Sequence, residues 1–249
     1  MQIEIRMEVP TLIGKMQMNS PKILAIIPAR GGSKGIPKKN LYSLAGKPLI
    51  QYSIEAAKKS KLISDFIVST DSDEIKQTAI NLGAKVPFMR PQDLSHDTAL
   101  AIPTIQHSVL TYEKMLNCKF DFIIMLQPTA PLRTAEDIDK SLELLINSDA
   151  DGIISVVDVE NYHPQKMKII INDQLKDFDE TSAENPPRQS LSPIYIVNGA
   201  IYATNRDILM NKNTFKGDHC LPFVMPDERS ANIDKITDFL IAEYHIKNS

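Results

Sequence analysis

The sequence predicts an α/β fold in which a mostly parallel sheet is flanked by helices. Short apolar runs at 23–27, 66–70 and 122–126 are typical of strands that helices cover on both faces. Between these runs, apolar residues recur with the period of an amphipathic helix. The length of 249 residues and the hydrophobic content of 43% suit one domain with a sizeable core. This alternation indicates right-handed crossovers and ligands at the carboxyl ends of the strands.

The boundaries of the elements follow from residues that start or stop helices. Pro48 suits the first turn of a helix, the acidic cluster at 71–74 is a good helix N-terminus, and Gly83 ends that helix. Asp97 and Thr98 are expected to cap the next, longer helix. The expected elements are a strand at 23–27, a helix at 48–59, a strand at 66–70, a helix at 75–82, a weak strand at 84–88, a helix from 97 to 115, a strand at 122–126, a helix at 134–146, strands at 152–157 and 195–202, and a helix at 236–246.

The second half of the chain begins with the same alternation and then departs from it. Thr134 and Asp137 are placed as in a capping box, which defines the start of their helix. Later, the residues 168–171 and a segment around Leu175 indicate a short hairpin that turns through 172–173. A polar, proline-containing stretch follows. These pieces are too small to fold alone, so we expect them to lean on the main domain or on another subunit.

The first twenty residues look like an irregular extension. They carry Glu4, Arg6 and Glu8 and lack a continuous apolar core, so they do not resemble a secretory signal. We expect residues 1–20 to be poorly ordered, and Met18 is an equally good natural start. The expected organisation is one domain over 21–249.

Composition narrows the class of partner and the compartment. A net charge of −3 gives no electrostatic reason to expect nucleic acid or an anionic membrane as partner. No window has the roughly 18 consecutive apolar residues of a membrane helix. Cys118 and Cys220 are far apart and lack metal-ligand spacing, which favours a reduced, cytoplasmic protein over one with a single disulfide.

The strand at 23–27 stops at Pro28 and gives way to a basic loop. The loop combines cations, glycines and a serine, namely Arg30, Gly31, Gly32, Ser33, Lys34, Gly35, Lys38 and Lys39. Glycines let backbone N–H groups approach an anion, and the cations neutralise it. After a buried first strand, this composition predicts a polyphosphate site. The sequences GxxxxGK[ST] and GxGxxG are absent, which disfavours P-loop phosphotransferases and dinucleotide-binding oxidoreductases.

The loop closely resembles the opening motif of one enzyme family. The segment PARGGSKGIP at 28–37, followed by KNL at 39–41, is similar to the start of the CMP-sialic acid synthetase family, including its pseudaminic and legionaminic acid cytidylyltransferases. Further matching segments occur in the same order at 69–71, 127–133, 188–189, 198–202 and 232–234. The resemblance spans about 22–243 and implies a Rossmann-like nucleotidyltransferase fold.

The resemblance also implies roles for individual residues. Nucleotide binding is implied for Ala29, Arg30, Gly31, Gly32, Ser33, Lys34, Lys39, Asn40 and Arg90. Sugar-acid binding is implied for Gln127, Arg188, Gln189 and Tyr195, the last three in a region that also supports a dimer. Catalytic roles are implied for Arg30, Lys39, Gln127 and Asp234. The hairpin region at about 160–193 resembles the dimerisation arm of the family, so a homodimer is expected, with the arm closing over the partner's sugar site.

The implied reaction is transfer of CMP from CTP to the 2-hydroxyl of a nonulosonic acid, with release of pyrophosphate. Charge builds on phosphate oxygens, so the protein needs cations and Mg²⁺ more than a nucleophile. Asp234 is expected to ligate Mg²⁺, which takes one or two carboxylates together with phosphate oxygens and water. A helix cap is the alternative role for Asp234, and Asp71 is either a helix N-cap or a further metal ligand.

Two positions depart from the family pattern. The family usually has two aspartates flanking one residue before its final helix, but Asn232 replaces the first; its carbonyl oxygen can still ligate a metal, without the negative charge. Ala101 stands where sialic acid enzymes often have a serine that contacts the base. Nucleotide selectivity therefore stays open, including a guanylyl-transferring variant, and so does the identity of the nonulosonic acid.

Two alternative functions remain. A 3-deoxy-manno-octulosonate cytidylyltransferase usually carries an arginine in place of Lys34 and Gly35, which disfavours it here. A catalytically impaired, nucleotide-binding regulatory protein is favoured only by Asn232. Arg133 is expected to be structural, and Asp238 to belong to the last helix. The five histidines lack the spacing of metal ligands. We therefore expect surface or core positions for His96, His107, His163, His219 and His245.

Overall fold

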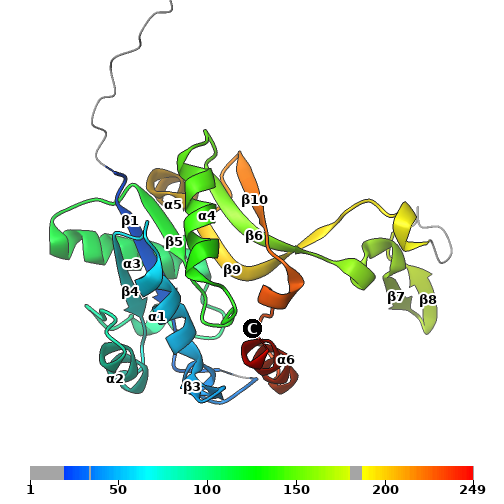
Figure 1. Cartoon of the computed structure of the whole chain (residues 1–249), viewed down its shortest axis with the longest axis horizontal. Helices are drawn as coiled ribbons and strands as arrows, with labels where there is room; N and C mark the ends of the chain where they lie inside the picture. Colours follow the sequence, from blue (N-terminus) through cyan, green and yellow to red (C-terminus); the bar gives the residue numbers. More distant parts are fainter. Residues whose placement is uncertain (1–19, 34, 180–186, 249) are drawn as a thin grey trace, which may run out of the picture.

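The computed structural model of the chain describes residues 20–33, 35–179 and 187–248. The extension expected at 1–20 therefore lies outside the described residues, apart from Ser20. Figure 1 shows a body of sheet and helices from which one slender arm projects.

The body is built on a six-stranded sheet in the order β10-β6-β9-β5-β1-β4. β1 is parallel to β4 and β5, β10 is parallel to β6, and β9 is antiparallel to both of its neighbours. The predicted α/β fold with a mostly parallel sheet is thus confirmed. The strands are β1 (Ile23–Pro28), β4 (Asp65–Ser69), β5 (Phe122–Met125), β6 (Gly152–Asp158), β9 (Tyr195–Asn205) and β10 (Cys220–Val224).

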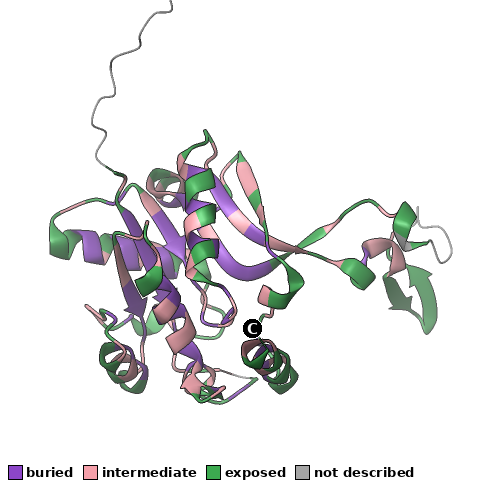
Figure 2. Cartoon of the chain, in the orientation of Figure 1, coloured by how far each residue is buried: buried purple, intermediate pink, exposed green. Residues whose placement is uncertain are grey.

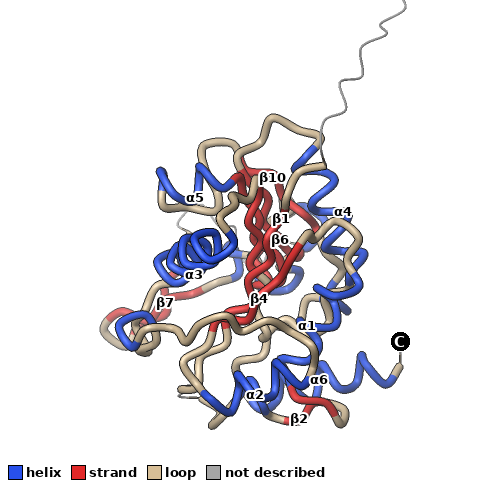
Figure 3. Tube along the Cα trace, turned by 90° about the vertical axis from the view of Figure 1, so that its left-hand side faces the viewer, coloured by secondary structure: helices blue, strands red, loops and turns tan. Residues whose placement is uncertain are grey.

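Helices cover both faces of this sheet, which explains why β1 is apolar throughout. Ala25 and Ile27 face a core cluster with α1, α2 and α4, whereas Leu24 and Ile26 face a second cluster with α3 and α5. Figure 2 shows the buried sheet between these layers, and Figure 3 shows α4 and α3 on opposite sides of it. The helices are α1 (Leu49–Lys59), α2 (Asp73–Asn81), α3 (Ala101–Leu116), α4 (Ala135–Ile146), α5 (Arg206–Lys212) and α6 (Ile236–Lys247).

The last helix packs away from the main sheet. Phe239 and Ala242 of α6 bury themselves against Leu44 of a small hairpin, formed by β2 (Ser43–Leu44) and β3 (Lys47–Pro48), and against Ile36 of the basic loop. This packing holds the segment before α6 beside the loop that follows β1.

The order of strands creates a crevice at one edge of the sheet. The chain passes from β1 to β4 on one side and then crosses to β5 on the other side of β1. At such a switch point the loops after neighbouring strands diverge and leave room for a ligand. The loops after β1 and β5 therefore lie on either side of one space.

The arm contains the predicted hairpin. β7 (Lys168–Ile171) and β8 (Gln174–Asp177) are antiparallel, and the turn residues Asn172 and Asp173 have φ angles of 50° and 60°, which a two-residue hairpin turn requires. Figure 2 shows both strands exposed, and Figure 1 shows them at the end of the extended β6 and β9, away from the body. The hairpin is confirmed. In the single chain it does not pack against the main domain.

Two of the expected local features are wrong. The weak strand at 84–88 is absent from the described sheet; only single bridges form at Lys85 and Met89. Asp97 and Thr98 do not cap the long helix, because α3 starts after Leu100 without a side-chain cap. Asp97 instead pairs with Arg30, and Thr98 hydrogen-bonds to a histidine ring.

The second half holds elements that the sequence pattern did not reveal. α5 is short, and β10 contains Pro222, which occurs in strands only at sheet edges, where its missing N–H is tolerated. β9 is longer than expected and antiparallel. A register shift opposite Ile154 and Val156 bulges β9 at 198–201, and Gly199 within the bulge has a φ of +76°.

Other findings concern the helices and the thiols. Among the described residues, none of the helices has the length and apolar character needed to span a bilayer. Cys118 and Cys220 are both free thiols. The capping box of Thr134 and Asp137 is present at the start of α4, as predicted.

Candidate active site

The basic loop after β1 is held by its own side chains and by the end of β4. The Nδ2 of Asn40 donates to the backbone oxygen of Arg30 at 2.9 Å, which closes the loop across its width. The backbone N–H of Gly31 donates to Oδ1 of Asp71 at 2.8 Å. A Cβ at Gly31 would lie 2.9 Å from the Cβ of Ser72, so the close approach requires glycine. Asp71 therefore supports the loop, and Ser72 rather than Asp71 is the N-cap of α2.

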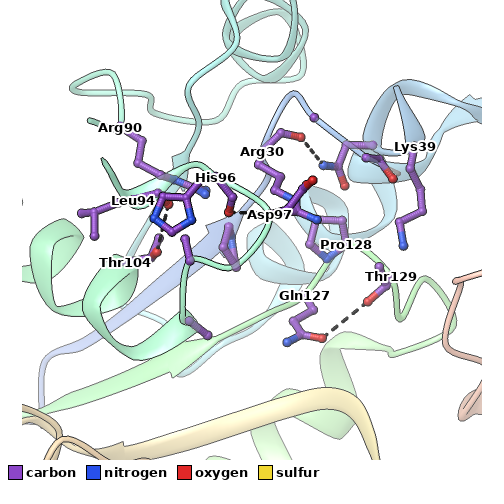
Figure 4. A pocket seen from close by; sticks show the side chains of 16 residues that line it. Arg30, Lys39, Arg90, Leu94, His96, Asp97, Thr104, Gln127, Pro128 and Thr129 are labelled. Carbon is purple, nitrogen blue, oxygen red and sulfur yellow. Dashed lines mark hydrogen bonds and ion pairs between the residues drawn. The ribbon is translucent and has the colours of Figure 1, made fainter. Parts of the chain in front are cut away.

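One pocket of about 320 Å³ lies between the loops after β1 and β5 and the segment that leads from α2 into α3 (Figure 4). Of the sequence-predicted site residues, it is lined by Arg30, Gly32, Ser33, Lys39, Asn40, Arg90 and Gln127. Ala29 is fully buried beneath it. Lys34 lies outside the described residues. The pocket thus brings together most of the predicted nucleotide-binding residues and one predicted sugar-acid ligand.

Two cations of the basic loop are already oriented by hydrogen bonds. The Arg30 guanidinium donates to the backbone oxygen of His96 at 3.3 Å and pairs with Asp97 at 3.2 Å. The ammonium of Lys39 lies 2.7 Å from the backbone oxygen of Ile233 and 3.1 Å from Oδ1 of Asp234. The Lys39 side chain is only 16% exposed, so its charge acts in a setting that water screens less than it screens a surface lysine.

Arg90 supplies a third cation from the segment between α2 and α3. Its Nε donates to Oγ of Ser69 at 3.2 Å, and its Nη2 donates to the backbone oxygen of the same serine. The pKa of Arg90 is lowered to about 10, mainly by burial; nearby Asp71 opposes this shift and Arg30 adds to it. The side chain is still protonated at neutral pH. It presents a fixed positive charge at the wall of the pocket.

The opposite end of the pocket is formed by the loop after β5. Oε1 of Gln127 accepts a hydrogen bond from Thr129 at 3.5 Å, and the two side chains face the pocket in Figure 4. A Cβ built on Gly199 would lie 3.1 Å from this Oε1 and 3.5 Å from Nδ2 of Asn232. The bulge of β9 thus places its glycine between Gln127 and Asn232.

The acidic candidates do not form a preassembled metal centre. Among the described residues, no three side chains of His, Cys, Asp or Glu are grouped to hold a metal ion. The carboxylate of Asp234 is 68% exposed and pairs with Lys39. Asp238 accepts hydrogen bonds from the backbone N–H groups of Asp234 and Lys235, so it caps α6, as expected of a residue of the last helix. Asp234 itself is not the cap.

The residues predicted on the arm lie away from this pocket in the single chain. Tyr195 begins β9 and is 46% exposed, and Gln189 belongs to a short 3₁₀ helix in the arm. Neither residue lines the pocket, and the side chain of Arg188 lies outside the described structure.

Sequence reasoning missed several lining residues, most of them between the end of β4 and α3. They are Leu94, His96, Asp97, Ala99, Thr104, Pro128 and Thr129. Ala101, noted as a departure from the family, also lines the pocket. His96, expected on the surface or in the core, is exposed and lines the pocket, with Nδ1 2.9 Å from Oγ1 of Thr98. The signal for this segment was its position directly after Arg90.

Comparisons with known proteins agree with the geometry. The profile of a family described as Cytidylyltransferase matches residues 24–218. Over 226 residues the chain is 36% identical to the post-translational flagellin modification protein B of Campylobacter coli, covering 91% of this chain and 95% of that protein. It is 34% identical to the CMP-N,N'-diacetyllegionaminic acid synthase of Legionella pneumophila and 32% identical to a pseudaminic acid cytidylyltransferase of Campylobacter jejuni, in each case over 89% of this chain and 95% of the relative.

Solved structures show the same architecture. The CMP:2-keto-3-deoxy-manno-octonic acid synthetase complexed with CTP superposes with a TM-score of 0.67 at 20% identity, over 91% of this chain and 99% of that one. A 4-diphosphocytidyl-2C-methyl-D-erythritol synthase gives 0.64 at 12% identity, over 91% and 98%. These likenesses establish the fold. Because the family profile spans most of the chain and the relatives above 30% identity align over nearly its whole length, the chain belongs to the cytidylyltransferase family.

Proposed function

We propose that this chain transfers CMP from CTP to the 2-hydroxyl of a nonulosonic acid and releases pyrophosphate. The observation that carries the proposal is the pocket, where cations from two loops, Arg30, Lys39 and Arg90, stand opposite the amide of Gln127. An anionic donor and a hydroxylated, anionic acceptor need this arrangement of charges. The sequence relatives, named for pseudaminic and legionaminic acids, support the acceptor class.

In the proposed reaction the 2-hydroxyl oxygen attacks the α-phosphorus of CTP. A new P–O bond forms, the bond to the leaving pyrophosphate breaks in line, and the hydroxyl proton is released. Arg30 and Lys39 neutralise the charge that builds on the phosphate oxygens. Backbone N–H groups at Gly32 and Ser33 complete the phosphate site. Because these groups are fixed before the substrates bind, little reorganisation is needed during the reaction.

The remaining residues divide between the two substrates. Arg90 and Asn40 lie against the nucleoside, with Ala101 beside the base, and Gln127 orients the sugar acid. Arg188, Gln189 and Tyr195 complete the sugar site or the subunit contact, after the arm of a second copy has closed over the pocket.

Mg²⁺ fits the residues at the mouth of the pocket. Asp234 offers an exposed carboxylate next to Lys39, and Asn232 offers an amide on the Gln127 side. Asp71 is the weaker candidate because its Oδ1 already accepts from Gly31. The protein alone supplies only part of a coordination shell, so phosphate oxygens and water would complete it. When bound, the ion would add positive charge at the phosphates.

The test of this proposal is pyrophosphate release with Mg²⁺, in a matrix of CTP, GTP and UTP against N-acetylneuraminic, legionaminic, pseudaminic and 3-deoxy-manno-octulosonic acids. We expect turnover with CTP and one nonulosonic acid, and loss of turnover on chelation of Mg²⁺. Turnover only with the octulosonic acid would show that the acceptor is not a nonulosonic acid. Turnover only with GTP would show that the donor is not CTP. CTP binding without any turnover would instead support the regulatory alternative based on Asn232.

We also propose that the chain is a cytoplasmic homodimer. The arm exposes Ile170 at 75%, Leu175 at 69% and Phe178 at 59%, and a monomer rarely leaves such side chains together in water. Packing against a second copy would bury them.

Replacing Ile170 and Leu175 together by Asp is therefore expected to convert a dimer into a monomer. Light scattering coupled to size-exclusion chromatography measures the mass. A matched double replacement of Leu110 and Leu144, exposed leucines on α3 and α4, should leave the mass of the dimer unchanged. A wild-type protein that is monomeric at micromolar concentration would contradict the dimer.

A further inference from the structure

Arg133, which follows β5, is a buried cation outside the pocket. It is 3% exposed and lies six residues after Gln127 in the chain. Its pKa is lowered to about 10 by burial, so it stays protonated at neutral pH. Asp137 attracts it, but the carboxylate of Asp137 is bound by Arg229 at 2.8 Å.

The guanidinium of Arg133 donates to three separate parts of the fold. Nη1 lies 2.8 Å from the backbone oxygen of Ala200 in the bulge of β9 and 3.3 Å from the backbone oxygen of Gln127. Nη2 lies 2.7 Å from Oγ of Ser53 on α1. Ser53 in turn donates to the same oxygen of Gln127 at 3.2 Å. The backbone of Gln127 is thus fixed from two sides.

The hydrogen bonds of Arg133 reach both segments that frame the sugar-acid end of the pocket. One is the turn after β5, where the N–H of Ala130 also donates to the oxygen of Gln127 at 3.3 Å. The other is the bulge of β9, whose Gly199 lies against the Gln127 side chain. Rotation of the Gln127 peptide group or a shift of the bulge would therefore break contacts to one guanidinium.

A mainly structural role explains this arrangement poorly. The Nε of Arg133 is buried without a hydrogen-bond partner among the described residues. A buried cation that binds carbonyls instead of a carboxylate costs stability, and an apolar side chain of similar volume would fill the same space at lower cost. The planar fork of arginine is the feature that an apolar residue or lysine lacks.

We propose that Arg133 is a positioning residue which, with Ser53, fixes Gln127 and the bulge of β9 for the sugar acid. The proposal rests on the function proposed above, in which Gln127 orients that substrate. Lysine at this position keeps the charge but cannot bridge the three acceptors. Methionine keeps much of the volume and loses the charge as well.

The variants Ser53→Ala, Arg133→Lys and Arg133→Met test the proposal against Arg206→Met. Arg206 is the control because its side chain is only 12% exposed and well hydrogen-bonded but pairs with Glu113, away from every residue that lines the pocket. For Arg133→Lys we expect a rise of at least about tenfold in the KM for the sugar acid or a matching fall in kcat. The KM for CTP should change less than twofold.

Backbone exchange gives a second readout that does not need turnover. The amides of Ala130 and Ile233 report on this corner, since Ile233 donates to the backbone oxygen of Thr129 at 2.7 Å. In Arg133→Lys and Ser53→Ala, exchange at both amides should be at least about tenfold faster in the folded protein. In Arg206→Met it should follow only the global stability.

Equal loss of stability in the Arg133 and Arg206 variants, with unchanged sugar-acid KM and unchanged local exchange, would overturn the positioning role. If the wild-type protein fails to turn over any nonulosonic acid, the proposed function falls. The exchange experiment then still decides whether Arg133 holds Gln127 in place.

Discussion

Replacing Lys39 by Met is expected to lower kcat/KM by about 10² to 10³, the range found when a fixed group that stabilises developing charge is removed. The Lys39 ammonium is mostly buried and is held by Ile233 and Asp234 at the mouth of the pocket. Methionine fills a similar volume but brings no charge to the phosphates. Steady-state pyrophosphate release at varied CTP measures the loss, which should fall mainly on kcat.

Lys38 provides the matched control for this prediction. It is the neighbouring residue, its side chain is 67% exposed, and it pairs with Glu74 on α2 instead of facing the pocket. Lys38→Met should leave kcat/KM within about twofold, because exposed ion pairs contribute little. An equal fall in both variants would mean that general positive charge on the loop matters, and not the placement of Lys39.

Replacing Glu113 by Gln is expected to lower the free energy of unfolding by about 2–4 kcal/mol, since it removes one partner of a buried ion pair. Glu113 accepts from Nε and Nη2 of Arg206 at 2.8 and 2.7 Å, and the two side chains are 7% and 12% exposed. Its Oε1 also accepts from the N–H of Phe120. These hydrogen bonds tie the end of α3 to the start of α5 and raise the pKa of Arg206.

Urea denaturation followed by circular dichroism measures this loss. Asp207, which also pairs with Arg206 but is 75% exposed, gives the control: Asp207→Asn should have no measurable effect. Activity per folded molecule should stay unchanged in both variants, because this ion pair lies outside the pocket. A stable Glu113→Gln protein would show that Arg206 finds other partners.

The alternation of strands, loops and helices in the sequence was sufficient to predict the residues on the nucleotide side of the pocket. Ligands of parallel sheets bind beyond the carboxyl ends of the strands, so the glycines and cations after β1 could be placed at a ligand site without knowing any contact. Arg30, Lys39 and Asn40 do lie together for this reason. Arg133 is buried, as expected of a structural residue, but its hydrogen bonds to the backbone oxygens of Gln127 and Ala200, which suggest a positioning role, are visible only in the structure.

The pairing of strands that are far apart in the sequence could not be predicted from local sequence patterns. β9 has the alternation of any strand, and nothing in its residues reveals that it inserts antiparallel between β5 and β6. Its bulge, which carries Gly199 to Gln127, depends on that pairing. Asp71 illustrates the same limit, because an acidic residue after a strand suits a helix cap or a metal, yet its partner is the N–H of Gly31, 40 positions earlier in the chain.

The segment between Arg90 and α3 shows how a competing contact can override capping preference. Asp97 and Thr98 have the side chains of N-caps, but Asp97 is drawn to Arg30 across the pocket. The helix therefore starts later, and the residues in between become the wall of the pocket. The sequence contained the residues of this wall but no periodic signal that identifies them.

The residues that line the pocket are distributed unevenly along the chain. All of its lining residues lie between Pro28 and Thr129, whereas the bulge of β9, the arm and the segment before α6 come from the second half of the chain. In the proposed roles, Gln127 is the sugar-acid residue of the first stretch, and Arg188, Gln189 and Tyr195 of the second stretch complete the sugar site or the subunit contact. Changes confined to the arm can then alter the choice of acidic sugar during evolution, while Gln127 and the nucleotide-binding residues of the first stretch stay the same.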